Sequence, residues 1–175
     1  MRRLFLIATL AALSSGAALA QTGRRAPGFS LPDLKGTEHD LQEYRGKIVV
    51  LEIMRSECPH CAGFAKILEE TKTFYGGRVV ILAIANPPDD QQTVGNFAAR
   101  QRITYPILFD CGQVAYSYIL PDPLHGPGVT IPHAYLIDAN GTIRGDWVYG
   151  PQTADIFEGK GLHAAIDKLL GDKPR

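Results

Sequence analysis

The chain has 175 residues, of which 18 are basic and 18 are acidic, so it carries no net charge. Neither a basic cluster nor a run of like charges is present, which argues against a nucleic-acid partner. Beyond the N-terminus, no apolar stretch approaches the roughly 20 residues that a membrane span needs. Length and composition therefore predict one globular domain.

The first 20 residues have the features of an export signal. A basic start, Met1-Arg2-Arg3, precedes an apolar run from Leu4 to Leu13, and Ala18-Leu19-Ala20 has the A-x-A form of a signal-peptidase site. We therefore expect residues 1–20 to be a cleaved signal peptide and residues 21–175 to form a single domain, periplasmic or secreted. The alternative is an N-terminal anchor that stays attached to the chain.

Strand and helix patterns alternate along the rest of the chain. A strand-like segment at residues 29–31 is followed, at residues 47–54, by a nearly continuous apolar run, which is typical of a strand buried on both faces. A helix begins after Cys58 and ends at Gly76-Gly77. The further predicted elements, in chain order, are a buried strand at 78–85, a helix opened by Asp89-Asp90, a short strand at 105–109, a short helix at 114–119, strands at 133–137 and 142–148, and an amphipathic helix at 162–170.

This alternation predicts an α/β fold with a mixed central sheet flanked by helices. The Asp-Ala-Asn-Gly turn at residues 138–141 is a strong hairpin signal. We therefore expect the last two strands to form an antiparallel edge of that sheet.

The sequence contains three cysteines, Cys58, Cys61 and Cys111. A disulfide between Cys58 and Cys61 closes a very small loop and would stabilise the fold little, so redox chemistry explains this pair better than a structural role. Half of a zinc site is another alternative, but the remaining candidate ligands show no paired spacing. We expect no metal and no other cofactor. Cys111 is expected to be a buried small apolar residue, with a third redox thiol or an intermolecular link as the alternatives.

The motif Cys58-Pro59-His60-Cys61 opens a helix directly after a buried strand. A cysteine at a helix N-terminus faces unpaired backbone N–H groups and the positive end of the helix dipole, which favour its thiolate. Pro59 suits the first turn because its missing N–H costs nothing there. His60 can add a positive charge or a hydrogen-bond donor beside the sulfur. These features predict that Cys58 is the nucleophile and that Cys61, one turn into the helix, is the resolving thiol.

Glu52 is a carboxylate in the middle of an apolar strand, where its charge would be costly to bury. It precedes Cys58 by six residues, so strand geometry can place it underneath the cysteine pair. Buried there, it should have a raised pKa and could accept the Cys61 proton, directly or through water. The alternative is that Glu52 reaches the sheet edge and is solvated.

Several segments resemble the thioredoxin superfamily. The resemblance rests on Gly46–Glu52, the Cys-Pro-His-Cys motif, Ile131-Pro132 and the Asn-Gly hairpin. Residues 26–36 and 44–47 are similar to the opening of the TlpA/ResA and AhpC/TSA redoxin group, and the active-site motif locally resembles that of DsbA. The resemblance implies a thioredoxin-like fold over roughly residues 26–170, with an added N-terminal hairpin and a central insertion.

The same resemblance implies roles for individual residues. Cys58 matches the nucleophile, Cys61 the resolving thiol and Glu52 the buried acid below the disulfide. Pro132 matches the cis-proline that faces the cysteines and helps to bind extended substrate polypeptide, with Ile131 offering backbone groups. These five residues, with Pro59 and His60, form the predicted site.

Two features depart from the family pattern. Arg55-Ser56-Glu57 stands where thioredoxins and the TlpA group commonly have an aromatic approach to the motif. His133 follows the proline where a small polar residue is frequent. We expect His125 and His133 to be surface histidines without a role, with proximity to the cysteines as the alternative.

Together these features predict an exported, monomeric thiol-disulfide oxidoreductase that acts on cysteines or disulfides of protein substrates and has a membrane redox partner. His60 argues for an oxidant, because stabilising the reduced thiolate makes the pair more oxidising, whereas the TlpA/ResA framework argues for a reductant.

A peroxiredoxin-like peroxidase is an alternative function, but Leu51 and Arg55 occupy the positions of its peroxide-holding Pro and Thr or Ser. A copper carrier of the Sco type is the other, but it would have three residues between its cysteines.

Overall fold

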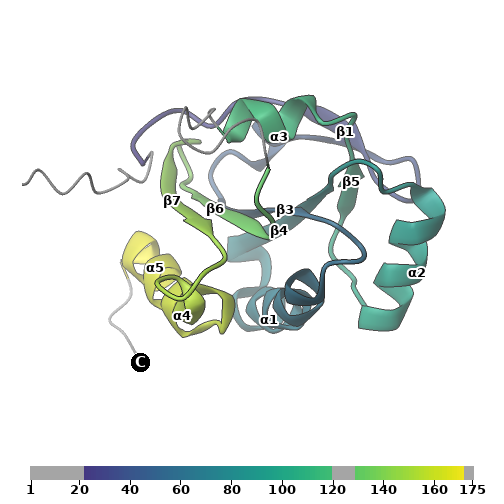
Figure 1. Cartoon of the computed structure of the whole chain (residues 1–175). Coiled ribbons are helices and arrows are strands. Elements are labelled where there is room, and N and C mark those ends of the chain that lie inside the picture. Colours follow the sequence, from purple (N-terminus) through teal and green to yellow (C-terminus); the bar gives the residue numbers. More distant parts are fainter. Residues whose placement is uncertain (1–21, 120–128, 172–175) are drawn as a thin grey trace, which may run out of the picture.

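The computed structural model describes residues 22–119 and 129–171, so the expected signal peptide lies outside the described residues. A five-stranded sheet with the order β5-β4-β3-β6-β7 forms the centre of the fold (Figure 1). Its strands are β3 (Ile48–Met54), β4 (Val79–Ala85), β5 (Ile107–Phe109), β6 (His133–Ile137) and β7 (Ile143–Val148). The pairs β3–β4 and β4–β5 are parallel, whereas β3–β6 and β6–β7 are antiparallel. The sheet is therefore mixed, as the sequence pattern predicts.

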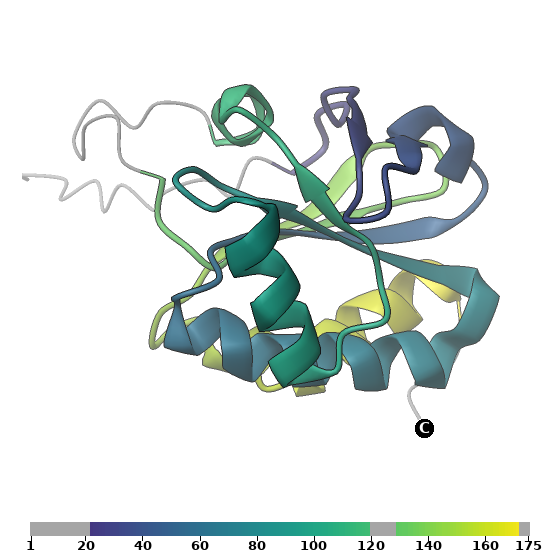
Figure 2. The same ribbon diagram turned by 90° about the vertical axis from the view of Figure 1, so that its right-hand side faces the viewer.

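Both faces of the sheet are covered (Figures 1 and 2). One face, here called the helical face, packs against α1 (Pro59–Tyr75), α2 (Gln91–Gln101), α4 (Ala154–Phe157) and α5 (Lys160–Leu170). The other, here called the hairpin face, packs against the N-terminal segment with β1 (Ser30–Pro32), β2 (Glu38–Asp40) and the 3₁₀ turn Leu41–Tyr44, and against α3 (Gln113–Tyr118). A second 3₁₀ turn, Gly76–Arg78, connects α1 to β4.

The position of β3 in the middle of the sheet explains why its sequence is almost wholly apolar. All seven of its residues are buried. Val50 and Met54 belong to the core on the helical face, and Leu51 and Ile53 belong to the core on the hairpin face. Because side chains alternate along a strand, Glu52 points to the helical face, towards α1. A strand covered on both sides has no solvated position at which a charge could rest.

Local sequence signals set the ends of the main elements. Helix α1 ends at Gly76, whose φ of 57° is a conformation that few other residues adopt without strain. Helix α2 begins with a capping box in which Asp90 and Thr93 satisfy each other's backbone N–H groups. At the β6–β7 hairpin, the Asp138 carboxylate accepts hydrogen bonds from the backbone N–H groups of Asn140 and Thr142, both at 2.9 Å. These turns fix where the strands and helices meet.

The antiparallel pair β1–β2 is the predicted N-terminal hairpin. The segment between β4 and β6, where the central insertion is expected, contains α2, β5 and α3. Helix α4 is not predicted by the sequence, because four residues are too short to show a helical repeat. Strand β5 begins at Ile107 rather than at residue 105, after a proline that has no N–H to donate. Within residues 22–119 and 129–171, no helix is long and apolar enough to cross a bilayer.

Candidate active site

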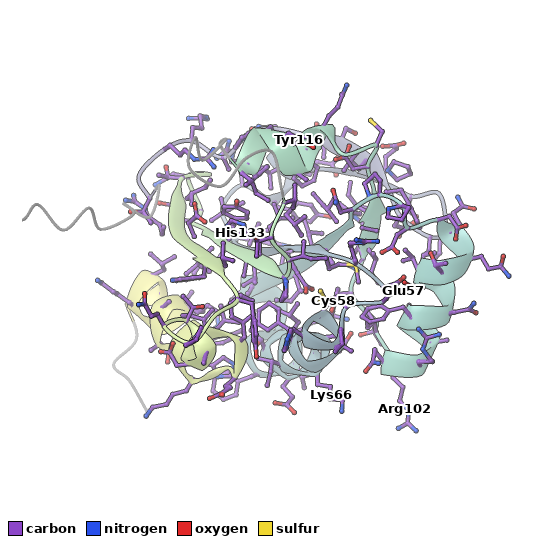
Figure 3. The ribbon with its side chains drawn as sticks, in the orientation of Figure 1. Glu57, Cys58, Lys66, Arg102, Tyr116 and His133 are labelled. Atoms are coloured by element: carbon purple, nitrogen blue, oxygen red, sulfur yellow. The ribbon has the colours of Figure 1, made fainter. Side chains whose placement is uncertain are left out.

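The two motif cysteines occupy different environments at the start of α1. Cys58 is the N-cap of the helix, and its Sγ accepts a hydrogen bond from the Cys61 backbone N–H at 3.3 Å. Cys58 is half-buried, whereas Cys61 is 0% exposed, and both are free thiols. Figure 3 shows Cys58 at the start of α1, beside the ends of the central strands. An accessible sulfur above an enclosed one is the arrangement that the motif predicts.

The Cys61 thiol is held in its protonated form. Burial raises the pKa of Cys61 far above the ordinary value for a cysteine, and the negative charge of nearby Glu52 raises it further. A hydrogen bond with Cys58 acts in the same direction. Cys61 therefore needs a base close by if it is to react as a thiolate near neutral pH.

Glu52 has a small residue on either side of it in the sheet. In the sheet register it is opposite Ala83 on β4 and Ala134 on β6, and these alanines share its face. The carboxylate is only 1% exposed, and its Oε1 has no hydrogen-bond partner among the described residues. Burial raises the pKa of Glu52 to about 8. The alternative of a solvated edge position is wrong, because β3 is the central strand.

Tyr105 is a neighbour of this pair that the sequence does not reveal. It is 5% exposed and belongs to the same core cluster as Cys61. The hydrogen bond from the Ala83 N–H to the Pro106 carbonyl oxygen, at 3.1 Å, brings this part of the chain alongside β4. Burial raises the pKa of Tyr105, and the charges of Glu52, Glu69 and Cys61 contribute in the same direction. The tyrosine is therefore within electrostatic reach of both groups.

The segment before the motif is held by polar contacts, where related proteins commonly have an aromatic residue. The Asp89 carboxylate accepts hydrogen bonds from the Ser56 backbone N–H at 2.6 Å and from the Ser56 hydroxyl at 2.8 Å. Ser56 is 6% exposed, and the Cys58 N–H donates to the Arg55 carbonyl oxygen at 3.2 Å. Asp89 follows a cis peptide bond between Pro87 and Pro88. The Ser56–Asp89 contact joins the segment before Cys58 to the segment after β4, across 33 residues, and no local pattern indicates it.

The cis-proline lies at the same end of the sheet as the cysteines. The Ile131–Pro132 bond is cis, as the family resemblance implies. Since His133 is opposite Ile53 in the antiparallel register, Pro132 is next to Met54, shortly before Cys58 in the chain. Pro132 is buried and Ile131 is half-buried. The Pro132 carbonyl oxygen accepts a hydrogen bond from the Tyr149 N–H at 3.1 Å.

His60 is exposed on the first turn of α1 and makes an aromatic contact that the sequence does not reveal. Its ring stacks on Tyr149, with centroids 4.0 Å apart and planes inclined by 23°. Within the described residues, no hydrogen bond joins His60 to the Cys58 sulfur, whose donor is the Cys61 backbone. Pro59, the neighbouring motif residue, takes the first helical position as expected.

Two predictions outside the motif are wrong. His133 is not a surface histidine: it is 5% exposed, its Nε2 lies 2.6 Å from Asp146 Oδ1, and its ring stacks on Tyr135 at 4.4 Å. Alternation in a strand buried on both faces, read across the predicted hairpin, could have indicated this pairing. Cys111 is exposed rather than buried, because it lies in the turn between β5 and α3. His125 lies outside the described residues.

The described part of the chain contains no group of three or more His, Cys, Asp or Glu side chains that could hold a metal ion. The site consists of a dithiol pair with a buried carboxyl group close to Cys61. A thioredoxin-like fold with such a pair at the start of α1 defines a thiol-disulfide oxidoreductase.

Comparison with known proteins agrees with this class. Residues 22–145 match the AhpC/TSA family, and the chain belongs to that family. It is 34% identical over 137 residues to the thiol-disulfide oxidoreductase ResA of Geobacillus kaustophilus, which covers 78% of this chain and 74% of the relative. It is 28% identical over 142 residues to the thioredoxin-like protein YneN of Bacillus subtilis, covering 80% and 78%. These matches confirm the TlpA/ResA-like resemblance within the thioredoxin superfamily.

Solved structures confirm the fold. A putative thiol:disulfide interchange protein DsbE from Chlorobium tepidum superimposes with a TM-score of 0.68 at 23% identity, covering 83% of this chain and 99% of that one. A putative protein disulfide isomerase from Bacteroides thetaiotaomicron gives a TM-score of 0.69 at 22% identity, with 88% and 92% covered. At these identities, the likeness shows the fold alone.

Proposed function

We propose that this oxidoreductase is exported and exchanges disulfides with the cysteines of protein substrates through Cys58 and Cys61. The observation that carries the proposal is the difference between the two sulfurs: Cys58 is accessible and caps α1, whereas Cys61 is enclosed beside Glu52. A nucleophile must reach its substrate, and a resolving thiol must wait until the mixed disulfide has formed.

The reaction in the reducing direction begins with the Cys58 thiolate. It attacks one sulfur of a substrate disulfide, so that a Cys58–substrate bond forms, the substrate S–S bond breaks, and the other substrate sulfur leaves as a thiolate that takes up a proton. Cys61 then loses its proton and attacks Cys58, which releases the second substrate thiol. The pair ends as a disulfide, and its two electrons have passed to the substrate. In the oxidising direction, the same steps run in reverse.

Glu52 is proposed as the base that accepts the Cys61 proton and returns it in the reverse step. Its pKa of about 8 is close to the pH at which such a protein works, so both protonation states are accessible. The high pKa of Cys61 makes a base necessary. Its neighbours across the sheet, Ala83 and Ala134, carry small side chains, and the transfer is proposed to run directly or through a water molecule.

Binding and location follow from the remaining predicted residues. Ile131 and Pro132 are proposed to hold an extended substrate segment beside Cys58, because they lie at the same end of the sheet. Residues 1–20 are proposed to be a cleaved signal peptide and residues 21–175 a single monomeric domain, periplasmic or secreted. A membrane redox partner would restore the pair after each turnover.

The test is reduction of insulin disulfides by dithiothreitol, with Cys58→Ser and Cys111→Ser compared with the wild type. We expect Cys58→Ser to reduce the rate to the uncatalysed level, while Cys111→Ser, which removes the exposed third thiol, keeps the wild-type rate. Retained activity in Cys58→Ser would overturn the mechanism. Steady peroxide turnover would favour a peroxidase instead, and tight stoichiometric Cu(I) binding would favour a metal carrier.

The direction of the reaction is decided by the reduction potential of the Cys58–Cys61 pair. A value near about −120 mV is that of a strong oxidant, and one near about −270 mV is that of a reductant. The potential is obtained by equilibrating the protein with glutathione buffers and quantifying the free thiols.

A further inference from the structure

The His60–Tyr149 contact is part of a larger aromatic arrangement at the start of α1. The Tyr149 ring also meets Phe157 of α4, at 5.3 Å and 74°, and Phe157 meets Phe64 of α1, at 4.7 Å and 58°. His60 and Phe64 are four residues apart, so they lie on the same side of the helix. We call these four residues the aromatic clamp. It fastens Tyr149 to the helical turn that carries the cysteines.

Tyr149 is held firmly although the residue is 37% exposed. Its backbone N–H donates to the Pro132 carbonyl oxygen, and its ring edge rests on Phe157, which is 6% exposed. The ring therefore offers a fixed aromatic face to His60. Without that face, an exposed histidine on a first helical turn would be free to change rotamer.

The aromatic clamp sets the position of the His60 imidazole relative to the Cys58 sulfur. In the structure, the imidazole lies on Tyr149, and the Cys58 Sγ receives its hydrogen bond from the Cys61 backbone instead. Stacking fixes the orientation of the imidazole, and in that orientation no hydrogen bond joins His60 to the Cys58 sulfur within the described residues. A histidine that is free to approach would stabilise the reduced thiolate and make the pair more oxidising.

We propose that Tyr149 is a positioning residue that holds His60 away from the Cys58 sulfur and so makes the pair more reducing than its Cys-Pro-His-Cys sequence indicates. This inference rests on the proposed function, since it concerns the potential of the same two cysteines. It also accounts for the two opposing indications of the sequence. His60 in the motif favours an oxidant, whereas the surrounding fold resembles that of a reductant. The Tyr149 ring, between β7 and α4, restrains His60 and so favours the second.

The test is the reduction potential of Tyr149→Ala, with three further variants. Tyr149→Leu keeps apolar packing against Phe157 but removes the ring face, Tyr149→Phe keeps the ring, and Val148→Ala truncates the neighbouring side chain of equal exposure. We expect Ala and Leu at position 149 to shift the equilibrium with glutathione towards the dithiol form by about three- to tenfold, which at tenfold is about 30 mV. Tyr149→Phe and Val148→Ala should match the wild type.

A double-mutant cycle shows whether the effect passes through His60. In a His60→Ala background, Tyr149→Leu should leave the potential unchanged, because the restrained group is already absent. The inference is overturned if the single variants keep the wild-type potential or become more reducing, or if Tyr149→Leu has the same effect without His60. Equilibration with glutathione needs no protein substrate, so this result and the insulin assay can fail independently.

Discussion

Two buried ionisable groups lie close together on opposite faces of the sheet and differ in whether an acidic partner lies beside them. Glu52, on the helical face, has an oxygen without a partner among the described residues. The Nε2 of His133, on the hairpin face, lies 2.6 Å from Asp146 Oδ1, while its Nδ1 has no partner among the described residues. In the β3–β6 register they are adjacent positions, since Glu52 faces Ala134 and Ile53 faces His133. A buried group that has a counter-charge contributes to the structure, whereas one without it is poised to exchange a proton.

The largest effect on stability is expected at Glu52, and it tests whether this carboxyl group exchanges a proton in the folded protein. Its pKa of about 8 in the folded protein lies above the ordinary value of 4.5, so folding favours the protonated carboxyl group. The corresponding stability is fully present below about pH 4.5 and is lost as the pH rises through about 8. Between about pH 5 and pH 8, the free energy of unfolding of the reduced protein should therefore fall by roughly 3 kcal/mol because of this group.

Urea unfolding of Glu52→Gln, followed across that pH range under reducing conditions, checks this. The variant should lack the decrease, while Glu57→Gln, which changes an exposed glutamate beside the motif, should keep it. Parallel stability curves for Glu52→Gln and the wild type would show that the carboxyl group does not titrate in the folded state as described.

A smaller effect is expected on the hairpin face. Asp146→Ala removes the partner of His133 and leaves a buried imidazole without its acceptor, which should lower the free energy of unfolding by about 2 kcal/mol. The reduction potential of the cysteine pair should stay at the wild-type value, because His133 and Asp146 are on the other side of the sheet from α1. A shifted potential would contradict the separation of the two faces.

The smallest effect on stability is expected at Tyr135, whose neutral hydroxyl lacks a partner among the described residues, as does one oxygen of the ionisable Glu52 carboxyl group. The Tyr135 hydroxyl is buried and, among the described residues, has no hydrogen-bond partner. Tyr135→Phe removes that hydroxyl and keeps the ring that stacks on His133. We expect thermal unfolding to show unchanged stability or a gain of up to about 1 kcal/mol. A clear loss of stability would mean that the hydroxyl has a partner of its own.

The sequence predicted the central part of the site because that part is local. Glu52, Cys58 and Cys61 belong to a single strand, turn and helix, so the alternation of a buried strand and the chemistry of a helix start are sufficient to place them. The same short-range patterns predicted the sheet, α1 and the β6–β7 hairpin. Strand β2 and helix α4 were too short to produce a pattern of their own.

The surroundings of the cysteines could not be predicted because long-range packing creates them. Nothing near Ser56 in the sequence indicates Asp89, and nothing near His60 indicates Tyr149. The polarity of a histidine predicts a surface position for His133, but the strand that contains it is buried along its whole length. The family resemblance supplied the cis-proline, which the local sequence did not determine.

The capping role of Cys58 has a consequence for the helix itself. The atom that exchanges electrons with substrates is also the acceptor that satisfies the Cys61 backbone N–H at the first turn of α1. A thiolate is a stronger acceptor than a sulfur bonded to another sulfur, so the helix end is held most firmly when the pair is reduced and ionised. We therefore expect this hydrogen bond at the first turn of α1 to strengthen when the pair is reduced and to weaken when it is oxidised.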